Sequence, residues 1–188
     1  MKYEKKPTEV LEEEHHFIKK VVGAMAILAE EVEHGKEVDT KTLESIADFM
    51  RIFGDKCHHG KEEMHLFPAL ERKGVPMRGC PLGALVAEHQ KGRNLVKELT
   101  QATADYANSD SGAKDSLLKS LHGLIDLYPN HIWKEDYLAF PMADKILSDD
   151  EQRELSAKFE MVENEIGREA HHRFEELAKE LEERVGKR

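Results

Sequence analysis

One pattern of histidine, glutamate and proline residues occurs twice in this chain, and it restricts the possible folds more than any other feature. Each copy opens with Glu-His. Each then continues with a second His that is followed by Lys-Glu three and four positions later, and by Phe-Pro nine and ten positions later. The separation from the first to the second His is 43 residues for His15 and His58, and 42 for His89 and His131. The agreement of spacing, residue type and duplication indicates a site built from two similar halves.

The spacing within each copy suits metal binding by helices. Side chains four residues apart lie on the same face of a helix, so the His and the Glu of each second segment can hold one ion from one side. The single His at the start of each copy would add a ligand from another helix. Burying such groups together is costly unless a cation or hydrogen bonds compensate. The repeat therefore gives six candidate metal ligands: His15, His58, Glu62, His89, His131 and Glu135.

Composition favours one globular domain over residues 1–188. The chain has 188 residues, of which 35% are charged and 39% hydrophobic, and this length suits one domain. Its net charge of −10 argues against nucleic acid as a partner, because phosphates require a basic surface. It contains no apolar run of roughly 18 residues, so no membrane span is expected. The N-terminal segment lacks the apolar core of a secretory signal, and two cysteines are too few for a disulfide framework. A cytoplasmic location is expected.

Apolar residues recur at helical spacing along most of the sequence, and the fold class expected is all-α. Between the helical stretches lie segments rich in Gly, Pro and Asn. We predict a four-helix bundle over residues 8–147, followed by an additional C-terminal fifth helix over residues 148–186. Ser148 and Glu151 form a capping box that would start this fifth helix. Its apolar stripe packs along the bundle or pairs with another chain, so a monomer and a homodimer both stay open.

Two adjacent His-x-x-x-Glu pairs compete on the predicted second helix. They are His58 with Glu62 and His59 with Glu63. Matching the Lys-Glu and Phe-Pro positions of the two copies selects His58 and Glu62. Neighbouring residues on an α-helix point about 100° apart, given 3.6 residues per turn, so both pairs cannot serve the same centre equally. We therefore interpret His59 and Glu63 as residues of a second layer or of the surface.

The candidate ligands are imidazoles and carboxylates without thiolates, which suits iron, manganese or zinc. A duplicated half-site predicts two ions, and we expect two iron ions as the cofactor, with Mn or Zn as alternatives. Cys57 precedes a candidate ligand and is interpreted as a packing residue. A redox pairing of Cys57 with Cys80 stays open.

These segments, in this order, resemble the hemerythrin-like proteins (the hemerythrin HHE cation-binding family). The resemblance is to the bacterial and archaeal branch with the order His, His-x-x-x-Glu, His, His-x-x-x-Glu. It covers about residues 8–147 and rests on residues 14–15, 58–68, 88–93 and 131–141. The resemblance implies an up-down four-helix bundle around a non-heme di-iron centre. It also implies that the two Glu carboxylates bridge the irons and that the histidines cap them.

The chain departs from the oxygen-carrying hemerythrins at one position. Those proteins have a second His one turn after the His of the third helix, whereas this chain has Arg93 there. His171 in the fifth helix lies on a small, apolar flank and is our candidate for the missing metal ligand. Its neighbour His172 lies among charged residues. The alternative is that His171 is a surface residue of a charged helix.

The resemblance implies a centre that binds O2 or a related small diatomic or peroxide ligand. Two alternatives stay open: an enzyme that acts on peroxide or nitric oxide, and a bundle that holds metal for iron storage or for structure alone. Catalytic residues other than the candidate ligands cannot be identified from the sequence, so whether the protein is an enzyme is left undecided.

Overall fold

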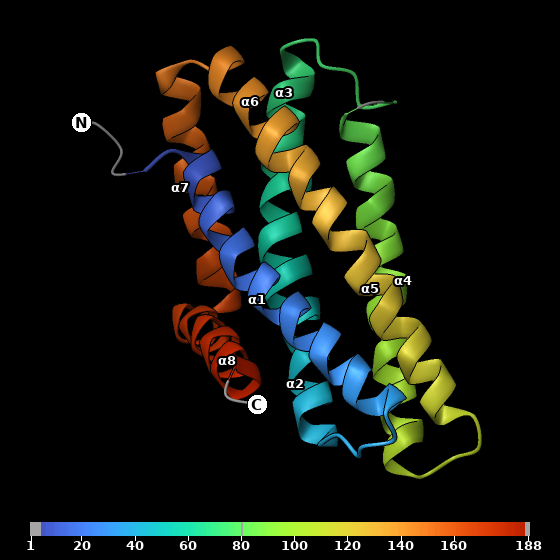
Figure 1. The fold of residues 1–188 in the computed structure, drawn as a ribbon. Helices are drawn as coiled ribbons and strands as arrows, with labels where there is room; N and C mark the ends of the chain where they lie inside the picture. Colours follow the sequence, from blue (N-terminus) through green and yellow to red (C-terminus); the bar gives the residue numbers. More distant parts are fainter. Residues whose placement is uncertain (1–4, 80, 187–188) are drawn as a thin grey trace.

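The structure is a computed structural model that describes residues 5–79 and 81–186, and every regular element in these two stretches is helical. The predicted all-α fold is thereby confirmed. Cys80 lies outside the described residues. Four long helical segments run alternately up and down (Figure 1). The first segment is α1 (Pro7–Glu33) and the third is α4 (Leu82–Ala107). The second consists of α2 (Thr40–Phe49), η1 (Met50–His59), η2 (Glu62–Leu66) and α3 (Phe67–Arg72). The fourth consists of α5 (Ala113–Lys134), η3 (Glu135–Ala139) and α6 (Phe140–Ile146).

The second and fourth segments change from α-helical to π-helical geometry along their length. The π-helical stretches are η1 and η2 in the second segment and η3 in the fourth. Pro68 and Pro141 follow η2 and η3 and stand in the first turn of α3 and α6. Each proline lacks the N–H that would continue the backbone hydrogen bonding of its helical segment. Neither proline ends its helical segment.

The predicted fifth helix is two helices, not one. Ser148 caps α7 (Asp149–Ile166) through the expected capping box with Glu151. α7 ends at Gly167, whose φ of 94° lies in a region that only glycine adopts readily. The chain then turns into α8 (Arg168–Gly186), which runs at an angle to α7 beside the lower part of α1 (Figure 1).

The hydrophobic core consists of two clusters. The larger one includes Ile18, Phe53, Val96 and Ile132, and α8 adds Phe174, Ala178 and Leu181 to it. The smaller one includes Leu11, Leu66, Leu85 and Ala139 from the bundle, and α7 adds Leu155 and Phe159. Along every bundle segment the predicted metal ligands lie between a member of one cluster and a member of the other. The polar layer is therefore closed off by apolar packing on both sides.

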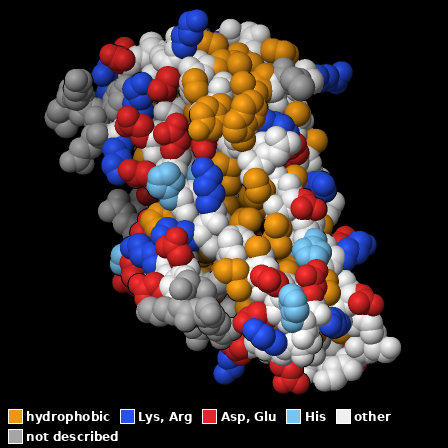
Figure 2. Space-filling model, in the orientation of Figure 1, with side chains coloured by type: hydrophobic (Ala, Val, Ile, Leu, Met, Phe, Trp, Pro, Cys, Tyr) orange, Lys and Arg blue, Asp and Glu red, His pale blue; other side chains and the backbone are white. Residues whose placement is uncertain are grey.

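One face of the molecule has an uneven surface. Figure 2 shows charged side chains over much of this face, and hydrophobic side chains gathered over its upper part, where η3 and α6 lie. Trp133, Tyr137 and Leu138 are exposed hydrophobic residues in and next to η3. No helix among the described residues is long and apolar enough to cross a membrane.

Candidate metal centre

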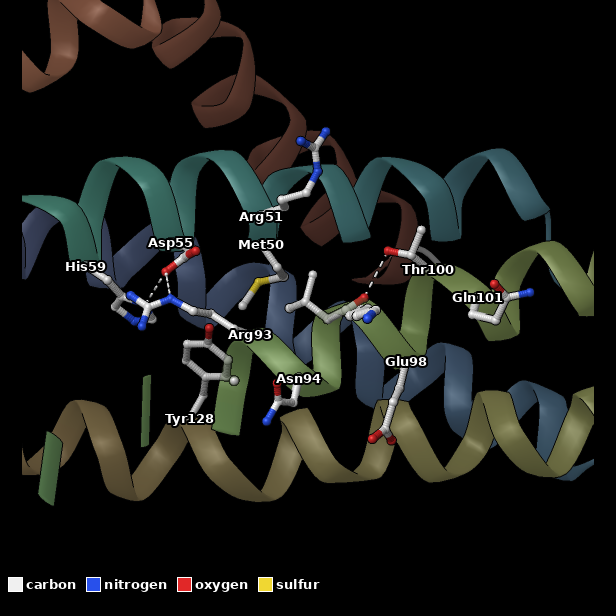
Figure 3. Close-up of a pocket in the computed structure, with 13 residues that line it drawn as sticks. Met50, Arg51, Asp55, His59, Arg93, Asn94, Glu98, Thr100, Gln101 and Tyr128 are labelled. Carbon is white, nitrogen blue, oxygen red and sulfur yellow. Dashed lines mark hydrogen bonds and ion pairs between the residues drawn. The ribbon is translucent and has the colours of Figure 1, made fainter. Parts of the chain in front are cut away.

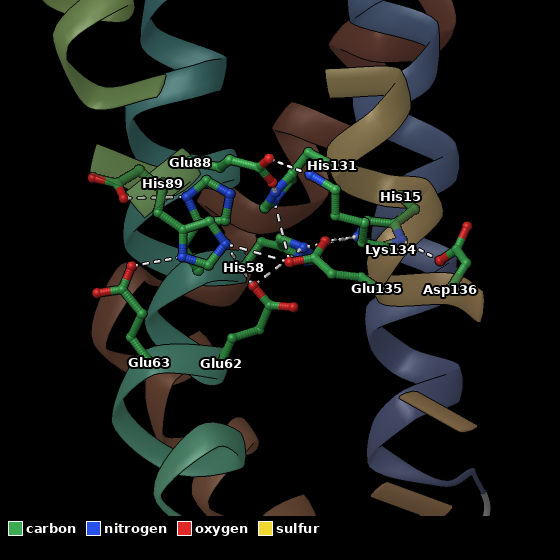
Figure 4. Close-up of polar contacts among 12 residues, drawn as sticks. His15, His58, Glu62, Glu63, Glu88, His89, His131, Lys134, Glu135 and Asp136 are labelled. Carbon is green, nitrogen blue, oxygen red and sulfur yellow. Dashed lines mark hydrogen bonds and ion pairs between the residues drawn. The ribbon is translucent and has the colours of Figure 1, made fainter. Parts of the chain in front are cut away.

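Five histidines and two glutamates form one buried layer across the bundle (Figure 4). Every one of the four long segments contributes to this layer, and none of the seven residues is more than 2% exposed. The six residues that the repeat predicts are all in it, together with His59. The seven are His15 of α1, His58 and His59 of η1, Glu62 of η2, His89 of α4, His131 of α5 and Glu135 of η3.

Their ligating atoms form two neighbouring groups. In the first group, His15 Nε2 lies 3.0 Å from His58 Nε2 and 3.1 Å from Glu135 Oε2. The second group consists of His59, His89 and His131. Its Nε2 atoms of His89 and His131 lie 3.3 and 3.1 Å from Glu135 Oε1. The two oxygens of Glu135 thus face different groups, as a carboxylate that bridges two ions requires.

Glu62 lies between the same two groups. Its Oε2 is 3.4 Å from His89 Nε2 and 3.8 Å from His58 Nε2. Neither oxygen of Glu62 has a contact with hydrogen-bond geometry in the described structure. The same holds for Glu135 Oε2, His59 Nε2 and His131 Nε2, although the Glu135 carboxylate lies 3.1 Å from both His15 Nε2 and His131 Nε2. Buried polar atoms are normally satisfied. A cation pair between the two groups would satisfy all of these atoms together, so the residues present fit a two-metal site.

The charges in the layer point to the same conclusion. Burial raises the pKa of Glu62 well above its usual value, and the charge of the nearby Glu135 raises it further. Burial lowers the pKa of His58 to about 4, which favours the neutral imidazole that a metal requires. Cations between the two carboxylates would favour the charged form of Glu62, because an opposite charge nearby lowers the pKa of a carboxyl group.

Each of the five histidines turns its Nδ1 toward a carboxylate, which fixes the ring with Nε2 facing inward. His58 Nδ1 lies 3.0 Å from Glu14, and His131 Nδ1 lies 3.0 Å from Glu88. The single histidines are held by the acidic residue of the other half. His15 Nδ1 is 2.5 Å from Asp136, and His89 Nδ1 is 2.6 Å from Glu63. The longest contact, 3.4 Å, joins His59 Nδ1 to Asp55.

These orienting carboxylates were not identified as such from the sequence, but the repeat contains the signal for them. Glu14 and Glu88 are the glutamates of the two Glu-His pairs, and Glu63 and Asp136 occupy matching positions one residue after the candidate bridging carboxylates. Glu63 therefore belongs to a second layer around the site. Of the two interpretations of Glu63, second layer or surface, the structure agrees with the first. Asp55 has no counterpart in the repeat that would have pointed to it.

The surface interpretation of His59 is wrong, and the cause is the π-helical geometry of η1. In a π-helix each turn contains more residues than in an α-helix, so neighbouring side chains are separated by a smaller angle. His58 and His59 therefore both face inward and reach different groups. His58 contacts His15, while the ring of His59 stacks on that of His89 with centroids 3.8 Å apart.

Arg93 occupies the position at which the oxygen-carrying hemerythrins have a further histidine. Its side chain belongs to the second layer around the site. Its Nε lies 2.8 Å from Asp55 and its Nη2 lies 2.7 Å from Glu63. It thus joins the carboxylates that orient His59 and His89. His59 provides the fifth histidine in place of a residue on α4.

The structure does not bring His171 into the layer. Its Nε2 lies 3.2 Å from Oε1 of Glu14, whose other oxygen holds His58 Nδ1. Glu14 therefore stands between His171 and the histidine–carboxylate groups. That His171 completes a coordination sphere stays a prediction, and these contacts do not support it. His171 instead contacts a residue that orients a candidate ligand. His172 is exposed, as expected.

Glu14 is the centre of a buried polar network beneath α7 and α8. Lys61, fully buried, places its Nζ 2.5 Å from Glu14 and 2.6 Å from Glu163 of α7. Burial alone would raise the pKa of Glu14, but Lys61 and the two histidines lower it well below the usual range. Burial and the charge of Glu14 also raise the pKa of Cys57 to about 12. Cys57 thus stays a protonated thiol, and it is packed among buried residues, as predicted.

Residues 6–143 match the family model described as Hemerythrin HHE cation binding domain. Among curated proteins, the chain is 27% identical over 152 residues to an uncharacterised protein of Mycobacterium bovis and to uncharacterised proteins of two Mycobacterium tuberculosis strains. These alignments cover 81% of this chain and 59% of each relative. The chain thus spans less than two thirds of the length of these relatives. No solved structure gives a significant match.

Proposed function

This chain belongs to the hemerythrin HHE cation-binding family, and we propose that it holds two iron ions in the buried layer and binds O2 or a related small ligand there. One observation carries the proposal. Atoms of Glu62, Glu135, His59 and His131 that suit metal ligation lie in one buried layer and lack contacts with hydrogen-bond geometry. A bundle core that holds such groups and has no cation would lose stability without any compensating gain.

Each ion would have its own set of residues. His15 and His58 would hold one ion, and the second would be held by the three histidines of the other group. Glu62 and Glu135 lie between the two positions and would contact both ions. Imidazole and carboxylate donors also suit manganese and zinc. A ferrous pair, when bound, supplies the electrons with which O2 or a peroxide can be bound or reduced.

The rest of the chain controls the surroundings of this pair. The carboxylates on the Nδ1 atoms keep the protons of the five imidazoles on the outer nitrogens, so that the Nε2 atoms remain free to bind metal. The two apolar clusters on either side exclude water from the layer. A dry site strengthens electrostatic interactions with a bound ligand, and this favours chemistry at the ions over exchange with solvent.

The test is anaerobic loading with ferrous iron, metal analysis, and visible spectra before and after exposure to air. We expect two irons per chain and an absorption band that appears with O2 and disappears when O2 is removed. Rapid irreversible oxidation with consumption of peroxide would favour the enzyme alternative. Further iron uptake beyond two per chain would favour storage. A content of one metal per chain would contradict the two-ion proposal.

A further inference from the structure

The outer side of the fourth segment has an exposed row of uncharged residues. Between Asp126 and Lys145, the residues exposed to solvent are Pro129, Asn130, Trp133, Tyr137, Leu138 and Pro141. None of these six is charged, although 35% of the chain is. Trp133, Tyr137 and Leu138 are 51%, 66% and 44% exposed, and hydrophobic side chains gather on this part of the surface (Figure 2). A continuous apolar surface that is open to solvent is typical of an interaction site.

The exposed row stays on one side of the segment because of η3. Every fourth residue from Pro129 to Lys145 is exposed, and in an α-helix with 3.6 residues per turn such a row would move steadily around the axis. A π-helical turn contains more residues, so η3 reduces this movement. Trp133 and Tyr137 stack with ring centroids 5.7 Å apart. Stacked rings have little side-chain freedom left to lose on binding, which suits the centre of an interface.

A cleft of about 730 Å³ lies elsewhere, between the second segment and α4 (Figure 3). His59, Arg93 and Tyr128 are among its lining residues, and His59 also belongs to the second group of candidate ligands. The cleft is therefore part of the surroundings of the metal centre. None of its lining residues belongs to the exposed row, so the row is a separate surface.

The charges of the exposed row lie at its two ends. Beside the row, Lys134 and Asp136 are paired with groups of α4 and α1. At the ends, the side chains of Asp126 and Lys145 form no ion pair or hydrogen bond within the part of the chain that the structure describes. A partner for this face must therefore present an apolar centre, a basic group at one end and an acidic group at the other.

A second copy of this chain, running antiparallel, supplies that pattern. Asp126 and Lys145 lie equally far along the sequence from the midpoint between residues 135 and 136, and so do Trp133 and Leu138. A two-fold axis at this midpoint would place each Asp126 opposite Lys145 of the other copy, and each Trp133 opposite Leu138. Contacts of this self-complementary kind are the commonest in symmetric oligomers.

We propose that the exposed row is a homodimer interface, in which two fourth segments pack antiparallel. Trp133 and Tyr137 form its apolar centre, and Asp126 and Lys145 form an ion pair at each end. This inference does not depend on the proposed function. Because the row occupies one side of a single segment, the interface is small, and we expect a dissociation constant on the order of 10 μM, as for transient complexes.

Sedimentation velocity over a concentration series measures the association. Trp133→Ser should weaken dimerisation by at least about thirtyfold, because a tryptophan at the centre of an interface typically contributes much of the binding energy. Tyr137→Ser is a second variant of the same centre and should also weaken it. The matched control is Met161→Ser on α7, since Met161 is 61% exposed and lies outside the exposed row. This control should associate as the wild type does.

A charge swap tests the antiparallel register. Asp126→Lys should weaken dimerisation by about tenfold, because it replaces two attractive contacts per dimer by two repulsive ones. Lys145→Asp should have the same effect for the same reason. The double variant Asp126→Lys/Lys145→Asp should restore wild-type association. Glu154→Lys, at an exposed site on α7, is the control for a change of charge alone.

Three outcomes would overturn the proposal. The first is a protein that sediments as a monomer up to about 1 mM, which would leave the exposed row to a partner other than this chain. The second is a dimer that neither Trp133→Ser nor Tyr137→Ser weakens, because its interface would lie elsewhere. The third is a double charge variant that stays as weak as the single ones. Thermal unfolding of each variant shows whether a lost dimer reflects a damaged fold.

Discussion

Lys61 and Lys134 occupy matching positions in the two halves of the repeat, yet Lys61 is fully buried and Lys134 is 24% exposed. Each pairs with the glutamate that orients a histidine, Glu14 for Lys61 and Glu88 for Lys134. The difference arises from the C-terminal helices. They cover the first half and add Glu163 to its network, whereas the second half has no such cover. A symmetric repeat has thereby become a site with one enclosed side and one side next to a cleft.

The two lysines should therefore differ in their contribution to stability. Lys61→Met would leave the carboxylate of Glu14 buried without its cation, and breaking a buried pair in this way costs about 3–5 kcal/mol. Lys134→Met removes a partly exposed pair, for which about 0–1 kcal/mol is expected. Urea unfolding of the metal-free proteins measures both values. Equal losses would show that burial by α7 and α8 does not control the network.

His59 should bind iron, contrary to what α-helical geometry predicts. Because its Nε2 lies without a partner in the group that contains His89 and His131, His59→Ala should lose about one iron per chain. His58→Ala should do the same from the other group. His16→Ala changes an exposed residue next to His15 and serves as the matched control. Metal analysis after anaerobic loading measures the content. Wild-type iron content in His59→Ala would contradict the assignment of His59.

The repeat was sufficient to predict the four bundle segments and the six residues that it brings together in one layer. Both the recurrence of apolar residues along each helix and the His-x-x-x-Glu spacing can be read from short stretches of sequence, and this is why the repeat was sufficient. The π-helical turns of η1 could not be predicted in this way. At the site these turns bring His59 inward beside His58, and no residue type in residues 50–59 marks such a turn.

The arrangement of the C-terminal helices was also beyond sequence reasoning. The apolar stripe predicted one continuous helix, because a single Gly inside a helical pattern is usually tolerated at a modest cost. At Gly167 the packing of Phe174 and Leu181 into the larger cluster favours a change of direction. This break brings His171 to Glu14, a contact that depends on tertiary structure.

His171→Ala should leave both irons in place, since His171 contacts Glu14 and no candidate ligand directly. The loss of a residue that orients a ligand typically weakens metal affinity by about 10- to 100-fold. His171 acts on the centre only through Glu14, so we expect its loss to weaken metal affinity by about tenfold or less. Competition with a chelator measures the affinity, and His172→Ala, an exposed neighbour, is the control. Loss of a whole iron from His171→Ala would restore His171 as a direct ligand.

Glu62→Gln should stabilise the metal-free protein while abolishing its stabilisation by iron. Burial and the charge of Glu135 raise the folded-state pKa of Glu62 above the ordinary 4.5. The folded state then binds this proton more tightly than the unfolded state, so stability falls as the pH rises above about 4.5. The uncharged amide of Glu62→Gln removes this loss, and the gain should therefore grow with pH. A gain of about 1 kcal/mol would raise Tm by about 2–4 °C in a chain of this size. Thermal unfolding at pH 5 and pH 8 with and without iron tests it, with Glu154→Gln at an exposed site as the control. A metal-free Glu62→Gln protein that is less stable than wild type at both pH values would contradict this account of the carboxylate pair.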